Sequence, residues 1–208
     1  MFKSRLEALS DGIFAIVFTL LVIEIKVPEH LTDKTGPGLI HALQEITPLF
    51  LSYFVSFVVL TMFWNAHSFL FNMFVKVTNR QISYLNLVFL CFISLLPFSA
   101  HLIGRYSDVN VAVVWYGLHV LILSILSASL LIYAFNSKEI DTSHNSSRIL
   151  KQAIIRQSLT FGFTIIGIIF AYFGYTNIAF GLYMFPILFN VIPGTLNFVE
   201  KTFGLKFE

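Results

Sequence analysis

The sequence has few charged residues, because only 12% of its 208 residues are Asp, Glu, Lys or Arg. A soluble domain carries about a quarter, so this amount cannot cover a surface that faces water. The shortage excludes a soluble enzyme, a disordered chain and a nucleic-acid-binding domain. The chain also has a single cysteine, Cys91, which excludes an internal disulfide and a disulfide-stapled secreted domain. We expect Cys91 to be a small buried side chain within its apolar run.

What the chain does contain is apolar sequence: 57% of the residues are hydrophobic, and 24 are Phe. This composition predicts an all-α integral membrane protein with one domain covering residues 1–208. A bilayer core of about 30 Å requires about 20 mostly apolar residues in a helix. Six segments meet this requirement: residues 11–27, 47–75, 82–103, 109–135, 153–175 and 177–199.

The connections between these spans are simple. The fifth and sixth spans are separated by a few residues around Thr176, which predicts a tight helical hairpin, and Pro186 and Pro193 interrupt the sixth span. Residues 136–147 are a polar connector, and residues 28–48 are a loop on the opposite side. The first span follows two basic residues but has no small-residue cleavage site, so we expect it to be retained.

Basic residues near the span ends predict the orientation. With a cytoplasmic N-terminus, ten of the thirteen Lys and Arg residues face inside: Lys3, Arg5, Lys76, Arg80, Lys138, Arg148, Lys151, Arg156, Lys201 and Lys206. The other three face outside: Lys26, Lys34 and Arg105. Both termini are therefore expected to be cytoplasmic.

The first span begins with unusual polar residues. Arg5 precedes Ser10 and Asp11, after which no charge occurs until Glu24. One interpretation is structural, with Ser10 or Asp11 as the N-cap and Asp11 at the positive end of the helix dipole. The second span favours another interpretation.

The second span carries Trp64, Asn65 and His67 within apolar sequence. His67 lies about 13 Å from the predicted cytoplasmic end of this span by helical rise. It is therefore at a depth near that of Ser10 and Asp11, and Asn86 of the third span returns to the same level. Because ionisable groups in a membrane are costly, we expect a buried polar network that holds the helices together.

An apolar stripe continues along the first span. Ile16, Leu20 and Ile23 are spaced to share one helix face, with Thr19 beside them. Such a stripe usually packs against other helices or faces lipid. Around a symmetry axis, however, several copies would form stacked hydrophobic rings that constrict a pore and gate it by dewetting.

These motifs resemble the endosomal/lysosomal potassium channel (transmembrane protein 175) family in its prokaryotic single-repeat form. The family signature, Arg-x-x-x-Phe-Ser-Asp, corresponds to Arg5, Leu9, Ser10 and Asp11, with Leu9 in place of the aromatic residue. Further matching positions are Gly12, Thr19, Trp64, His67 and the Leu96-Pro97-Phe98 turn. The resemblance covers the whole chain in span number and length, whereas the motifs lie in the first three spans.

The resemblance implies a homotetramer of six-helix subunits in the bacterial plasma membrane, with a cation pore lined by the first helix and potassium preferred over sodium. Ile16 resembles the narrowest hydrophobic ring, Thr19 the polar residue tied to selectivity, and Leu20 and Ile23 further rings. The residues that resemble the network bracing the pore helix are Arg5, Ser10, Asp11, Trp64 and His67, with Asn65 beside them. Potassium is the permeant ion, no cofactor is implied, and the partners are further copies of the chain and the bilayer.

Three alternatives remain. A proton-coupled secondary transporter would use Asp11 and His67 as a relay. A membrane enzyme is disfavoured because the six histidines lack metal-binding spacing and Ser10, Asp11 and His67 lack oxyanion-hole glycines. A scaffold without transport is the third. Glu24 and Glu29 near the outer end would raise the local cation concentration or be plain solvated loop charges.

Overall fold

The computed structural model describes residues 2–26, 35–137 and 146–191, and over these residues its regular elements are all α-helices. The predicted all-α class is therefore confirmed. In chain order the helices are α1 Lys3–Ile23, α2 Gly36–Glu45, α3 Thr47–Met73, α4 Arg80–Ser94, α5 Leu96–Arg105, α6 Asn110–Asn136, α7 Ser146–Tyr172 and α8 Thr176–Val191.

Five segments in the described part of the chain are long and apolar enough to cross a membrane. They are Lys3–Ile23, Thr47–Met73, Arg80–Arg105, Asn110–Asn136 and Ile154–Tyr172. The sixth predicted span corresponds to α8 as far as Val191, and its remainder, together with Pro193, lies outside the described residues. The number of spans beyond five stays a prediction.

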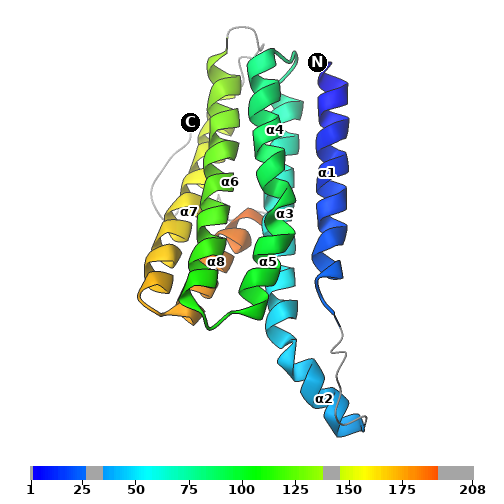
Figure 1. Ribbon diagram of the computed structural model, residues 1–208. Coiled ribbons are helices and arrows are strands. Elements are labelled where there is room, and N and C mark those ends of the chain that lie inside the picture. The colour runs from blue at the N-terminus through cyan, green and yellow to red at the C-terminus, as the bar shows by residue number, and fades with distance from the viewer. Residues whose placement is uncertain (1, 27–34, 138–145, 192–208) are drawn as a thin grey trace.

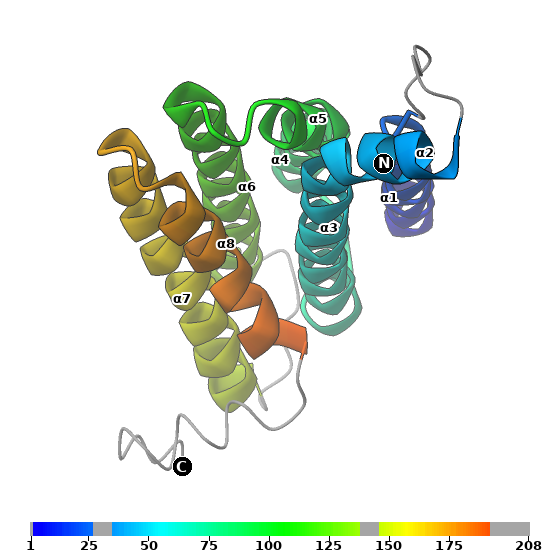
Figure 2. The ribbon, with the colours of Figure 1, turned by 90° about the horizontal axis from the view of Figure 1, so that it is seen from below.

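The long helices run side by side with α1 at one edge. Figure 1 shows α1 next to α3, α4 and α5, and these are the helices on which it packs. The view in Figure 2 places α7 and α8 on the side away from α1, where α6 packs on α4, α5 and α7, and α8 reaches α3. Among the described residues, the helix α1 thus has one face against the bundle and another that no helix covers.

The first helix begins earlier than the apolar run predicts. It starts at Lys3 rather than near residue 11, and Phe2 occupies the N-cap position. Lys3 and Glu7 face each other one turn apart, with Nζ and Oε1 separated by 3.4 Å. An (i, i+4) pair of opposite charge supports a helix in polar surroundings, so the helix extends beyond its apolar part.

The third predicted span consists of two helices. Pro97 stands in the first turn of α5 and has no N–H to donate to the carbonyl one turn before it. The preceding helix therefore ends at Ser94, and the Leu95 N–H bonds to the Phe92 carbonyl oxygen at 3.1 Å.

The predicted outer loop contains an additional helix, α2. The Thr35 hydroxyl oxygen accepts a hydrogen bond from the Gly38 N–H at 3.4 Å, and Pro37 lies in the first turn. Both features are typical of a helix N-terminus. Ile46 alone separates α2 from α3, and Figure 1 shows α2 projecting beyond the lower end of the bundle.

The tight hairpin predicted between the fifth and sixth spans is confirmed. Gly174 has a φ of 90° in the turn between α7 and α8, a conformation that favours glycine.

Farther along, the Tyr183 ring fits against Gly117 of α6 and Gly167 of α7. A Cβ placed on Gly117 would lie 2.2 Å from the Tyr183 hydroxyl oxygen, and one on Gly167 would lie 2.5 Å from Cε1. The two glycines thus form a socket that fixes α8.

The expectation that Cys91 is buried is wrong, because its side chain is exposed. The buried face of α4 is formed by Ile82, Ser83, Asn86, Phe89, Leu90 and Ile93, and Cys91 lies on another face. In a membrane protein an apolar run surrounds the whole helix, so hydropathy alone does not reveal which residues face the interior.

Candidate pore site

The helix α1 has a well-defined buried face. It consists of Leu6, Ser10, Phe14, Val17 and Leu21, which recur every three or four residues. Four of these five side chains are apolar and pack into the hydrophobic core. This periodicity fixes the rotation of α1 about its own axis.

The fixed rotation leaves the apolar stripe exposed among the residues that the structure describes. Ile16 is 59% exposed, Leu20 39% and Ile23 61%. Thr19 is exposed beside them, and its hydroxyl group donates to the Ile16 carbonyl oxygen at 2.7 Å. The four residues predicted to line a pore therefore lie on a surface of α1 that the described part of the subunit leaves exposed.

Small residues occupy the part of α1 opposite its buried face. Ala8, Gly12 and Ala15 are exposed at spacings of four and three residues, and Thr19 continues the series. A Cβ added to Gly12 would meet nothing within 4 Å. Small residues at this spacing allow membrane helices to approach one another closely.

Three predicted polar residues form a buried chain of hydrogen bonds between α1, α3 and α4. The His67 Nε2–H donates to Asn86 Oδ1 at 2.7 Å, and Asn86 Nδ2 donates to Ser10 Oγ at 3.0 Å. The Ser10 hydroxyl in turn donates to the Leu6 carbonyl oxygen at 2.9 Å. Each side chain donates to the next, and the last donates to a backbone carbonyl oxygen. Each of these three donors therefore has an acceptor.

The imidazole of His67 is enclosed by aromatic rings. Its centroid lies 4.4 Å from that of Phe71, 5.9 Å from that of Phe89 and 5.9 Å from that of Phe14. Only 4% of His67 is exposed. The ring is therefore a packed core element and is positioned to hold α1, α3 and α4 in register.

A second link joins α1 to α3 nearer the surface. Trp64 Nε1 donates to Asp11 Oδ1 at 3.2 Å, and both side chains are exposed. Asp11 lies inside α1, well after its start at Lys3, so the N-cap interpretation is wrong. The carboxylate faces the indole of a neighbouring helix instead.

Two other predicted network members lie apart from these contacts. Arg5 and Asn65 are both exposed. Within the part of the chain that the structure describes, neither side chain has a hydrogen bond or an ion pair. No group of three or more His, Cys, Asp or Glu residues suited to a metal ion occurs among the same residues.

A buried polar cluster that the sequence did not predict lies at the break between α4 and α5. The Ser99 hydroxyl donates to His119 Nδ1 at 2.7 Å, and Trp115 Nε1 donates to the Ser99 oxygen at 3.2 Å. His119 Nε2–H donates to the Phe92 carbonyl oxygen at 2.9 Å. The cluster thus ties α6 to the helix break. The proline at position 97 was the available signal for the break, but no spacing links Ser99 to His119.

Glu24, at the C-cap of α1, lies close to α5. Its Oε2 lies 3.3 Å from His101 Nδ1 of α5. The two side chains are 38% and 41% exposed, so the Glu24 carboxylate is solvated and also lies beside α5. Glu29 lies outside the described residues.

Comparisons with known proteins match the chain to one family. Residues 5–97 match the model of the family described as endosomal/lysosomal potassium channel TMEM175. A protein named as a potassium channel from Chryseobacterium sp. (strain P1-3) is 34% identical over 196 residues, which covers 93% of this chain and 94% of the relative. An endosomal/lysosomal proton channel TMEM175 from Gallus gallus is 37% identical over 111 residues, or 51% of this chain and 22% of that protein.

A solved structure shares the fold. The crystal structure of a lysosomal potassium-selective channel TMEM175 homolog from Chamaesiphon minutus superimposes with a TM-score of 0.71 at 28% sequence identity. The match covers 91% of this chain and 98% of that one. The helices described above therefore have the arrangement of a known channel subunit. The family consists of ion channels and not of enzymes, and this chain, a multi-pass membrane protein, belongs to the TMEM175 family.

Proposed function

We propose that the protein is a potassium-selective cation channel of the plasma membrane, preferring potassium modestly over sodium. Conduction is passive, through a central pore that copies of α1 surround. The observation that carries the proposal is the exposure of Ile16, Leu20 and Ile23 on a helix whose other face is fixed in the bundle. The names of the bacterial relatives as potassium channels support the same function.

Four copies of the chain, in a homotetramer, enclose the pore. A path cannot be enclosed by a single helix face, so several α1 helices must meet. The small residues Ala8, Gly12 and Ala15 support this arrangement, because they allow the backbones of neighbouring α1 helices to come close. The isoleucine and leucine side chains then project toward the axis.

The stacked rings act as a hydrophobic constriction. Ile16 and Ile23 are seven residues apart, which corresponds to about 10 Å along the helix axis. An apolar passage of this length excludes water when it is narrow and admits hydrated ions when it widens. Ile16 forms the narrowest ring in this proposal, and Leu20 and Ile23 form the further rings.

Thr19 offers the polar atom for an ion at this level. Its hydroxyl hydrogen is donated to the Ile16 carbonyl oxygen. The oxygen lone pairs are therefore left to face the axis, where they favour a cation over an anion. Four such oxygens replace part of the hydration shell of potassium.

The hydrogen-bond chain Ser10–Asn86–His67 and the Trp64–Asp11 link hold the pore helix in place. A rotation of α1 about its axis would break these contacts before it moved Ile16 away from the pore. In this role Arg5 is added from the family motif and Asn65 from its place beside Trp64, both at exposed positions where another subunit reaches them. The orientation has six spans with both termini in the cytoplasm, as the basic residues indicate.

The transporter alternative requires Asp11 and His67 to exchange a proton. The described contacts give them different partners, Trp64 for Asp11 and Asn86 for His67. The aromatic enclosure of His67 also favours a structural role. The test below therefore includes a proton gradient, since vertebrate relatives are named proton channels.

The test is cation flux into liposomes that contain the purified protein. Ile16→Asn should raise potassium flux severalfold by wetting the constriction. The control is Ile132→Asn on α6, because Ile132 is 56% exposed and thus closely matches Ile16. Equal flux through both variants and the wild type would contradict the assignment of Ile16. Flux that depends on a proton gradient in the wild type would favour the transporter.

A further inference from the structure

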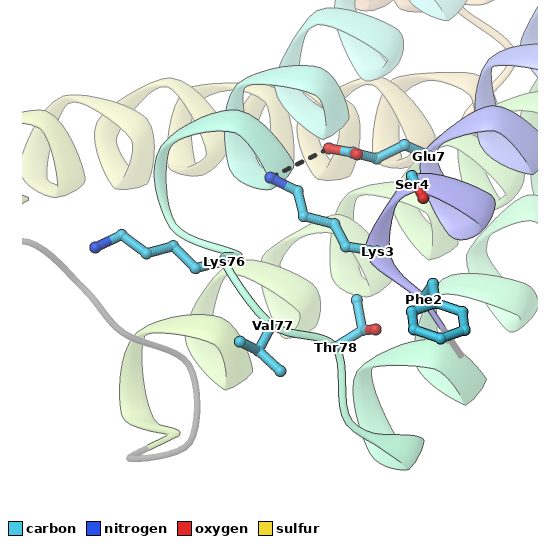
Figure 3. A pocket seen from close by; sticks show the side chains of 7 residues that line it. All are labelled: Phe2, Lys3, Ser4, Glu7, Lys76, Val77 and Thr78. Carbon is cyan, nitrogen blue, oxygen red and sulfur yellow. Dashed lines mark ion pairs between the residues drawn. The ribbon is translucent and has the colours of Figure 1, made fainter.

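An open pocket of about 670 Å³ lies at the end of the molecule where α1 begins. One wall comes from the start of α1, with Phe2, Lys3 and Ser4, and the other from the turn after α3, with Lys76 and Thr78. Figure 3 shows these two segments side by side around the pocket. Neither the family motifs nor the proposed pore uses this place.

The surroundings of the pocket are positively charged. The adjoining ends of α1, α3 and α4 carry Lys3, Arg5, Lys76 and Arg80 against one carboxylate, Glu7. Basic pockets between membrane helices on the cytoplasmic side are suited to anionic lipid headgroups. The hydroxyl groups of Ser4 and Thr78 add donors for an anionic oxygen.

Exposed apolar side chains flank the charged groups. Phe2 is 79% exposed and Val77 61%, and both line the pocket. This combination of ammonium groups, hydroxyl groups and apolar side chains occurs where five membrane-crossing segments place their ends near the headgroup layer. A free inorganic anion would gain nothing from Phe2 and Val77, whereas the glycerol and acyl parts of a lipid would pack on them.

We propose that this pocket binds the phosphate headgroup of an anionic phospholipid in the adjacent leaflet. Lys3 and Lys76 supply the charge, Ser4 and Thr78 donate to the phosphate oxygens, and Phe2 and Val77 contact the lipid below the headgroup. Lys3 is long and flexible enough to turn from Glu7 to a phosphate. Figure 3 shows Lys3 reaching to Glu7, with Nζ and Oε1 3.4 Å apart.

Glu7 therefore competes with the lipid for Lys3. This competition predicts a pattern of lipid affinities that loss of the ion pair alone cannot produce. Lys3→Gln and Glu7→Gln both remove the Lys3–Glu7 pair, yet they change lipid affinity in opposite directions. The first weakens binding because a positive charge is lost, and the second strengthens it because Lys3 is released.

The experiment is native mass spectrometry of the full-length protein, titrated with phosphatidylglycerol or with phosphatidylcholine. We expect tight adducts of phosphatidylglycerol but not of phosphatidylcholine. The double variant Lys3→Gln/Lys76→Gln should weaken the phosphatidylglycerol adducts roughly 25-fold, about 5-fold for each lysine. Glu7→Gln should strengthen them. The matched control Lys26→Gln/Arg105→Gln removes two exposed charges at the other end of the molecule and should change nothing.

Two results would overturn the proposal. One is equal retention of phosphatidylglycerol by the Lys3/Lys76 variant and by the Lys26/Arg105 control. The other comes from a competition arm in which inorganic phosphate displaces phosphatidylglycerol at equal concentration, since the pocket would then take a soluble anion. If the double variant fails to fold, Glu7→Gln decides alone, because weaker or unchanged binding in that variant contradicts the competition for Lys3.

Discussion

Asn86 is the side chain whose removal tests the buried hydrogen-bond chain most sharply. It accepts from His67 at 2.7 Å and donates to Ser10 at 3.0 Å, and it has no exposed surface. Asn86→Leu keeps the side-chain size but removes both hydrogen bonds. Ser10 loses little, because its hydroxyl still donates to the Leu6 carbonyl oxygen. The His67 N–H, by contrast, is left unpaired in a site that is 4% exposed.

The magnitude follows from that unpaired donor. A buried donor without a partner lowers the free energy of unfolding by about 1–3 kcal/mol. Replacing both partners by apolar groups of similar shape is nearly neutral. Asn86→Leu/His67→Phe should therefore be more stable than Asn86→Leu alone, since a Phe at position 67 fits among the rings of Phe71 and Phe89.

The assay is unfolding by sodium dodecyl sulfate in mixed micelles, followed by far-ultraviolet circular dichroism. The control is Asn72→Leu, an exposed asparagine of the same helix as His67, for which we expect a change within about 0.5 kcal/mol. The reasoning is refuted if Asn86→Leu costs no more than this control. It is also refuted if the two changes at positions 86 and 67 add, because independent sites would then be involved.

Two further predictions concern the packing behind the pore helix. Gly167→Ala should destabilise the protein by about 1–3 kcal/mol or more, because the new Cβ would lie 2.5 Å from Tyr183. The control is Gly162→Ala on the same helix, whose Cβ would meet nothing within 4 Å and which should be neutral or slightly stabilising. Equal thermal stability of the two variants would exclude the socket. Ser99→Ala should lower the free energy of unfolding by about 1–3 kcal/mol, because His119 Nδ1 then lacks its partner at 2.7 Å. An unchanged unfolding midpoint in the same micelles would mean that the cluster does not hold the helix break.

The sequence was sufficient to predict the residues of the buried chain. Ser10, His67 and Asn86 are polar residues in apolar helices, and the cost of burying them unpaired requires partners at the same depth. Depth along each helix follows from residue counting, so their meeting was predictable. Which atoms bond was not, because the rotation of each helix depends on how all the neighbours pack.

The predicted helix boundaries were wrong where a helix was assumed to end at the limits of its apolar run. The helix α1 extends back to Lys3 through a paired Glu7, and α2 forms at Thr35 although it is too short to cross a membrane. The signals for α2, a threonine cap followed by Pro37, were present. The break before α5 was likewise marked by Pro97.

Contacts between segments far apart in the chain could not be predicted from the sequence. Nothing in the spacing of Ser99, Trp115 and His119 indicates that they meet, because their contact depends on the angle at which α5 continues after the break. The exposure of Cys91 is another case, since a lipid-facing surface is as apolar as a core. The exposure of Ile16 also became visible only once the rotation of α1 was known.

The central claim, that copies of α1 enclose a passive potassium pore, is tested most directly by the reversal potential of purified protein in a planar bilayer with potassium on one side and sodium on the other. We expect a current whose reversal potential shows a preference for potassium over sodium. In Ile16→Asn the current should be larger, and its reversal potential should keep the same sign. The account is contradicted if no current flows, or if the current reverses with the proton gradient and ignores both cations.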